Sequence, residues 1–215
     1  MSAIIGRWTE ELLARSRQAS LKIHINIYEE SQWLSTVEKV MDNLERIQDL
    51  CLKVPDSYVE QVLSKLSSRA PRLQTLEITL DDSSLEWPSS LFAGTPPALH
   101  TLTLSRCSVP LSSFKLNALT SLGLYDVPDR FLLNIEEFLA VMSYMKNLEN
   151  LCLDYALTSA TGFPSSAVFR TFEKIDLPHL SFLLIHAPLS TDCRTAFPRK
   201  HSIDNSSRAR MPFRT

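Results

Sequence analysis

Short segments in which apolar and polar residues alternate recur along the chain. The clearest one spans residues 99–109 and reads LHTLTLSRCSV, with Leu99, Leu102 and Leu104 as its apolar positions. A period of two is typical of a strand that buries one face and exposes the other. Each segment of this kind therefore predicts a half-buried strand.

Segment 99–109 also matches the leucine-rich-repeat template L-x-x-L-x-L-x-x-N/C-x-L at every fixed position but the last, where valine replaces leucine. Cys107 fills the Asn/Cys position and is expected to be buried and structural. A degenerate copy upstream places Leu21 and Ile23 at positions 4 and 6, and Ile25 continues the alternation. The remaining copies share apolar residues at positions 1, 4 and 6, and the six first positions are Ile47, Leu73, Leu99, Leu119, Leu148 and Leu180.

These first positions are separated by 26, 26, 20, 29 and 32 residues, in or near the period of this repeat class. Neighbouring parallel strands need a crossover, which is commonly helical. Three spacers have helical periodicity, at 31–44, 57–69 and 134–144, and Ile135 and Phe138 belong to the apolar face of the third. The step from Leu99 to Leu119 is too short for a full helix, which favours an extended or 3₁₀ crossing.

The expected fold is therefore α/β, a leucine-rich-repeat solenoid with about seven parallel strands on the concave face and helices on the convex face. The repeat domain is expected to span residues 1–186, and residues 1–20 form an N-terminal capping helix whose helical pattern covers 7–16. Residues 187–215 contain no repeat. They are rich in Ser and Arg, carry a net charge of +4, and predict a disordered basic tail.

Three motifs carry a resemblance to a known family. They are WxxELLxRS at 8–16 ahead of LxIxI at 21–25, APxLxxLxI at 70–78, and LFxGxPxxLxxLxLxxC at 91–107. Over residues 7–185 the chain resembles the F-box/leucine-rich-repeat proteins that are abundant in mushroom-forming fungi. The resemblance implies an intracellular fungal protein whose repeats bind another protein.

In that family an F-box docks to the adaptor of a cullin-type ubiquitin ligase, and the repeats recruit a substrate. No F-box-like segment precedes Trp8, so docking to the ligase adaptor is not expected. The resemblance then implies a non-enzymatic protein-binding module like the substrate-recognition repeats of an F-box protein. The alternative is a partial or degenerate family member with no independent activity.

The residue types that carry common chemistry lack the necessary spacing. The chain has four glycines, too widely separated for a phosphate-binding loop, and its histidines and cysteines form no metal-binding or redox motif. We therefore expect no catalytic site, cofactor or metal. A net charge of −2 gives no reason to expect nucleic-acid binding, and the absence of a long apolar run predicts no membrane span. The expected location is the cytoplasm or the nucleus.

The candidate binding surface is the column of outward-facing strand positions. In a leucine-rich repeat, positions 3, 5 and 7 face the concave side, whereas positions 4 and 6 face the core. A solvated surface without a ligand remains the alternative, and the sequence does not identify the protein partner. The candidate residues for binding a protein are Lys53, Glu77, Thr79, Thr103, Ser105, Tyr125 and Asp154.

Overall fold

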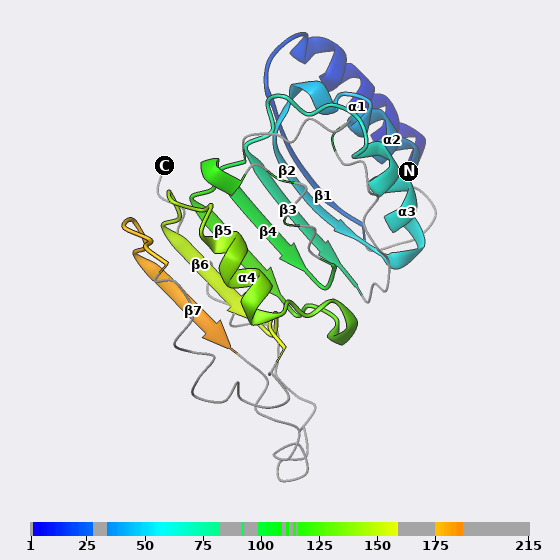
Figure 1. The fold of residues 1–215 in the computed structure, drawn as a ribbon. Coiled ribbons are helices and arrows are strands. Elements are labelled where there is room, and N and C mark those ends of the chain that lie inside the picture. The colour runs from blue at the N-terminus through cyan, green and yellow to red at the C-terminus, as the bar shows by residue number, and fades with distance from the viewer. Residues whose placement is uncertain are drawn as a thin grey trace, which may run out of the picture.

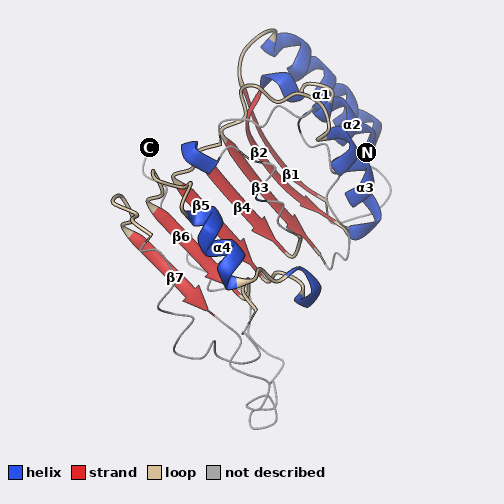
Figure 2. Cartoon of the chain, viewed as in Figure 1, coloured by secondary structure: helices blue, strands red, loops and turns tan. Residues whose placement is uncertain are grey.

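Seven strands form one sheet, all of them parallel and arranged in the order in which they occur along the chain (Figures 1 and 2). A computed structural model describes residues 2–27, 34–81, 92, 99–108, 111, 114, 116–158 and 175–186 of the chain. The predicted α/β class and the parallel arrangement of about seven strands are confirmed. The strands are β1 Leu21–Asn26, β2 Ile47–Val54, β3 Thr75–Leu80, β4 Thr101–Ser105, β5 Ser121–Tyr125, β6 Asn150–Asp154 and β7 Phe182–His186.

The helices pack on one face of this sheet. Side chains of α2, α3 and α4, such as Val37, Val62 and Phe138, join the strand residues Leu50 and Leu102 in one buried cluster. Helix α1 lies beside α2 (Figure 1). The helices are α1 Ser2–Ser16, α2 Leu34–Met41, α3 Asp56–Lys65 and α4 Ile135–Met142, with 3₁₀ turns at Leu44–Arg46, Leu116–Ala118 and Asp129–Phe131.

The predicted helices exist, but their ends differ. The helix predicted at 57–69 ends at Lys65, and the one predicted from residue 7 begins at Ser2. Residues 31–33 of the helix predicted at 31–44 lie outside the described residues. Ile135 was predicted on a buried face, yet it is 37% exposed because it occupies the first turn of α4. The 3₁₀ turn Leu116–Ala118 confirms the short crossing predicted between Leu99 and Leu119.

Burial along the strands follows the predicted alternation. Leu102 and Leu104 of β4 are fully buried, whereas Thr101, Thr103 and Ser105, which alternate with them, are partly exposed. Burying one leucine side chain contributes about 1.5–3 kcal/mol, so a row of such residues drives the stacking of the strands. The equivalent buried pairs are Leu50 and Leu52, Leu76 and Ile78, Leu122 and Leu124, and Leu151 and Leu153.

The same backbone hydrogen bonds recur from strand to strand. The carbonyl of His100 accepts two N–H donors, from Thr120 and Ser121, both at 2.9 Å. The carbonyl of Thr120 in turn accepts the N–H groups of Glu149 and Asn150, at 2.8 and 3.0 Å. The carbonyls of Gln74 and Glu149 are used in the same way. The four steps from β3 to β7 therefore start with one repeated geometry.

A second repeated feature ends three of the strands. Arg106, Asp126 and Tyr155 are the first residues after β4, β5 and β6, and their φ angles are 58°, 49° and 52°. This left-handed conformation costs a residue other than glycine roughly 1–2 kcal/mol. Each of the three is followed by a buried residue, among them Cys107, which confirms the predicted burial of that thiol. The turn therefore directs the chain from the exposed edge back into the core.

The predicted register of β1 is wrong. The template alignment placed Leu21 and Ile23 opposite the buried leucines of the next strand, but Ile23 pairs with Leu50 and Ile25 with Leu52. From Lys22 to Asn26 the register differs from the prediction by two residues, and the pairing is irregular between Leu21 and Lys22. A shift of two keeps the same side chains on the same face, so the sheet accommodates it without exposing the core.

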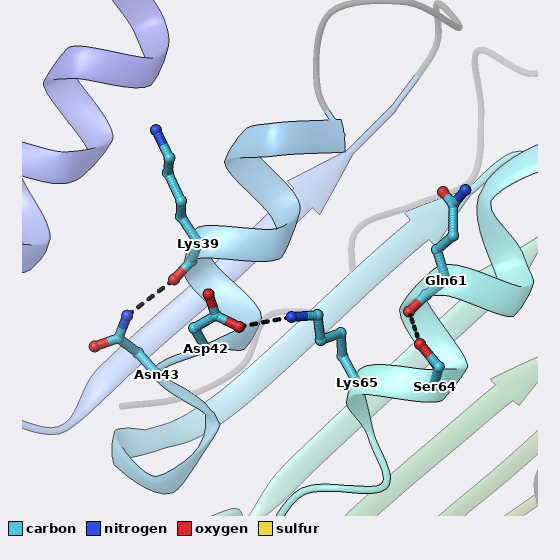
Figure 3. A network of polar contacts seen from close by, with 6 residues as sticks. All are labelled: Lys39, Asp42, Asn43, Gln61, Ser64 and Lys65. Atoms are coloured by element: carbon cyan, nitrogen blue, oxygen red, sulfur yellow. Dashed lines mark hydrogen bonds and ion pairs between the residues drawn. The ribbon is translucent and has the colours of Figure 1, made fainter.

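Polar contacts join the helices to one another on the side away from the sheet (Figure 3). Lys65 Nζ of α3 lies 2.7 Å from Asp42 Oδ1, just after α2, and Lys39 of α2 pairs with Glu10 of α1. Asn43 Nδ2 donates to the Lys39 carbonyl at 2.9 Å and so caps the end of α2. Exposed ion pairs contribute about 0–1 kcal/mol each, so these contacts orient the helices more than they stabilise them.

Candidate functional site: the open face of the sheet

The side of the sheet away from the described helices is termed the open face. Its residues alternate with the buried leucines, and most of them are partly or fully exposed, whereas Gly123 and Cys152 are buried. The structure brings all seven predicted binding residues onto this face, in two neighbouring rows across β2–β6. Register pairs Cys51, Glu77, Thr103, Gly123 and Cys152 in the first row, and Lys53, Thr79, Ser105, Tyr125 and Asp154 in the second.

Tyr125 shapes the middle of the open face by leaning over Gly123. A Cβ atom placed on Gly123 would lie 2.8 Å from Cε2 and 3.3 Å from the hydroxyl of Tyr125. A Cβ atom this close would require the Tyr125 ring to move, so glycine is the residue that leaves room for the ring in this position. The tyrosine side chain therefore lies along its own strand and reaches from the second row to the first. Gly123 itself becomes buried beneath it.

The surroundings of the Tyr125 hydroxyl keep it protonated. Burial raises its pKa above the usual value of 10.0, and a hydrogen bond that the hydroxyl shares with Cys152 raises this pKa further. The negative charges of Asp154 and Glu77 act in the same direction, because both oppose the tyrosinate anion. The phenol is therefore available as a neutral hydrogen-bonding group at all physiological pH values.

Asp154 also contacts the next strand. Its Oδ1 lies 3.2 Å from Nδ1 of His186, the last residue of β7. Sequence reasoning did not include His186 or Cys152 among the candidate residues. Their positions in the same two columns of the repeat were the signal that could have identified them. The structure thus extends the candidate surface by one strand.

Cys51 stands beside Glu77 on the open face and is held in its thiol form. Burial raises its pKa from 9.0 to about 12, and the charge of Glu77 together with a hydrogen bond to its carboxylate adds to the effect. The thiolate is the nucleophilic form of cysteine, so a raised pKa argues against a catalytic or redox role. Cys51 and Cys152 lie on β2 and β6, four strands apart and about 19 Å at about 4.8 Å per strand, too far for a disulfide.

Slow alkylation of Cys51 is the expected consequence. At pH 8 we expect iodoacetamide to modify Cys51 in the folded chain at least about a hundredfold more slowly than in the urea-unfolded chain, because each unit of raised pKa lowers the thiolate population about tenfold. Glu77→Gln should speed the reaction only in part, since burial is the larger cause. Mass spectrometry of the Cys51 peptide measures both rates, and equal rates in folded and unfolded chains would show that the thiol is not shielded.

The raised pKa of Cys51 also has a consequence for stability. The folded state binds the Cys51 thiol proton more tightly than the unfolded state does. The protonated thiol therefore contributes fully to the free energy of unfolding below about pH 9, and this contribution is lost as the pH rises toward 12.

Within the described ranges, no group of three or more histidine, cysteine, aspartate or glutamate side chains has a geometry that could hold a metal ion. None of the helices in the same ranges combines the length and apolar character needed to cross a bilayer. The chain has no match among protein-family models, among curated proteins or among solved structures.

Proposed function

We propose that the chain is a leucine-rich-repeat solenoid of the F-box/leucine-rich-repeat type and that its open face is a concave surface for binding a partner protein. The recurring hydrogen bonds of the His100 and Thr120 carbonyls support the repeat interpretation, because they join β5 to β4 and β6 to β5 in the same way. The order of the strands supports it too, since each strand neighbours only its predecessor and successor in sequence.

The observation that carries the binding proposal is the continuity of the two rows on the open face. They run from β2 to β6, and beside Gly123 they hold three hydroxyl-bearing side chains (Thr79, Thr103 and Ser105), two carboxylates, two thiols, one lysine and one tyrosine. Tyrosine is enriched among the residues that dominate protein–protein affinity, because it offers a large apolar area and a hydrogen-bonding hydroxyl. Tyr125 provides both near the middle of the sheet.

Binding without catalysis fits these residues better than an enzymatic role. Nucleophiles and general bases are activated by pKa values shifted toward neutrality. Cys51 and Tyr125 have pKa values shifted away from neutrality, and both remain protonated. A role as hydrogen-bonding contacts is consistent with that protonation state.

A degenerate family member without independent activity is the second candidate, favoured by one observation. Leu183 and Ile185 of β7 are 55% and 50% exposed, although the matching residues of β2–β6 are buried. An insufficiently covered end makes a repeat array prone to self-association. Aggregation of the purified chain that grows with concentration, without capture of a partner, would favour this second candidate.

Affinity capture with matched variants tests the binding proposal. The bait is the full chain, compared with Tyr125→Ala/Asp154→Ala on the open face and with Tyr144→Ala/Glu60→Ala on the helical side. We expect a partner to be retained by the wild type and the helical-side variant, and to bind the open-face variant at least about thirtyfold more weakly, because a central tyrosine contributes about 2 kcal/mol or more.

Cooperative unfolding of all three proteins is the required control. A partner that all three folded proteins capture equally would show that binding does not use the open face.

A further inference from the structure

Charge on the open face is unevenly distributed between the two ends of the sheet. Lys22 and Lys53 lie on β1 and β2, where Lys22 Nζ is 2.7 Å from Asp49 Oδ2. From β3 to β6 the outward positions of the strands hold two carboxylates, Glu77 and Asp154, and no cation. This half of the face is therefore negative while His186, whose Nδ1 lies 3.2 Å from Asp154 Oδ1, is uncharged.

Two cations border that half: Lys53 of β2 lies on the same face beside Thr79 of β3, and Arg106 is engaged elsewhere. Arg106 follows β4, and its Nε lies 3.8 Å from Asp126 Oδ2 at the edge beyond the strands. Its Nη1 donates to the Asp81 carbonyl at 3.1 Å. Arg106 is therefore held at the edge of the sheet, and it balances Asp126 and not the two carboxylates on the face.

Tyr125 lies between the two carboxylates. Its ring leans over Gly123 and is partly exposed, and the hydroxyl-bearing residues Thr103 and Ser105 separate it from Glu77. An aromatic ring attracts a cation placed over its face, and a nearby carboxylate strengthens that attraction. The same arrangement repels an anionic side chain. The neighbouring residues thus favour a guanidinium or ammonium group.

We propose that the open face over β3–β6 binds an extended partner segment carrying two basic side chains about four residues apart, one at Glu77 and one at Asp154, with Tyr125 between them. This inference rests on the proposed function and specifies the partner's chemistry. Glu77 and Asp154 are three strands apart, about 14 Å across the strands at about 4.8 Å per strand, and Asp154 lies two residues (about 7 Å) further along the strand direction, so their Cα atoms are about 16 Å apart. Side chains four residues apart in an extended segment point the same way and are about 13 Å apart, so two long basic side chains on a segment that crosses the strands can reach both carboxylates.

Three labelled peptides test the proposal with the full chain. The first is GRGSGRG, the second has citrulline in place of both arginines, and the third is GGSRRGG, in which the arginines are adjacent. Fluorescence anisotropy at low salt should give at least about tenfold tighter binding of the first peptide than of the citrulline peptide, and weaker binding of the third. Binding should weaken as salt increases, because the contacts are electrostatic.

Two double variants test whether the peptide binds over β3–β6 of the open face. Glu77→Gln/Asp154→Asn should weaken binding of GRGSGRG at least about tenfold. The control Glu60→Gln/Glu137→Gln, which also removes two carboxylates but on the helical side, should change it less than about twofold. Equal binding of the arginine and citrulline peptides, or equal loss in both variants, would overturn the inference.

The outcomes separate the two proposals. A partner lost by Tyr125→Ala/Asp154→Ala that contacts this face through an acidic or neutral segment overturns the inference and leaves the proposed function intact. Absence of both a captured partner and peptide binding contradicts both.

Discussion

Leu102→Ala is expected to lower the free energy of unfolding by about 3–5 kcal/mol, enough to remove much of the stability of a typical domain. Leu102 lies in the central strand β4, has none of its surface exposed, and pairs with Leu76 and Leu122 in the neighbouring strands. Its removal leaves a cavity that rigidly paired strands on both sides cannot close. Urea unfolding followed by circular dichroism measures the loss.

Thr103→Ala is the matched control. Thr103 is the next residue along the same strand and faces the open side, so its replacement should cost less than about 1 kcal/mol, the range of strand propensities. A larger loss for Thr103→Ala than for Leu102→Ala would mean that the two faces of the sheet are assigned the wrong way round.

Phe92→Ala is expected to lower the free energy of unfolding by about 3–5 kcal/mol as well. The Phe92 side chain is fully buried, its ring centre lies 6.1 Å from that of Phe114, and its N–H donates to the Leu66 carbonyl at 2.8 Å. Phe92 thus connects the end of α3 with the segment that follows β4. A double-mutant cycle with Phe114→Ala should give a coupling energy of about 0.5–1.5 kcal/mol.

The backbone of Phe92 supplies a control for this second prediction. Its φ angle is 53°, where glycine is favoured and alanine is not. Phe92→Gly should therefore be no less stable than Phe92→Ala, although glycine is normally the more destabilising of the two. A clearly less stable Phe92→Gly variant would contradict the left-handed conformation at this position.

The strands and their inward faces could be predicted because one physical rule determines both. A residue pattern such as Leu102-Thr103-Leu104 can bury its leucines only as a strand with one covered face, and repetition of that pattern predicts stacking of equivalent strands. The same rule placed Glu77, Tyr125 and Asp154 on one face. Their grouping in two rows followed from the alignment of the repeats.

The register of β1 could not be derived from the same rule. Leu21, Ile23 and Ile25 provide three apolar residues for two buried positions opposite Leu50 and Leu52. Because both alignments keep the same face buried, hydrophobicity does not distinguish between them. The choice between them is made in the folded backbone, where the pairing is also irregular beside Leu21.

The detailed shape of the candidate site could not be derived from the sequence either. The sequence placed Gly123 and Tyr125 on the open face but did not show that the ring leans over the glycine, because this depends on the side-chain rotamer. The sharing of a hydrogen bond between Tyr125 and Cys152 follows from the same rotamer. A glycine two residues before an exposed tyrosine on one strand was the available signal.

Site-specific photo-crosslinking tests most directly whether the open face is the binding surface. A photoreactive phenylalanine derivative replaces Thr103 on the open face in one sample and Glu60 on α3 in a second. We expect a partner to be crosslinked from position 103 and not from position 60. Crosslinking from position 60 alone would place the partner on the helical side and contradict the account.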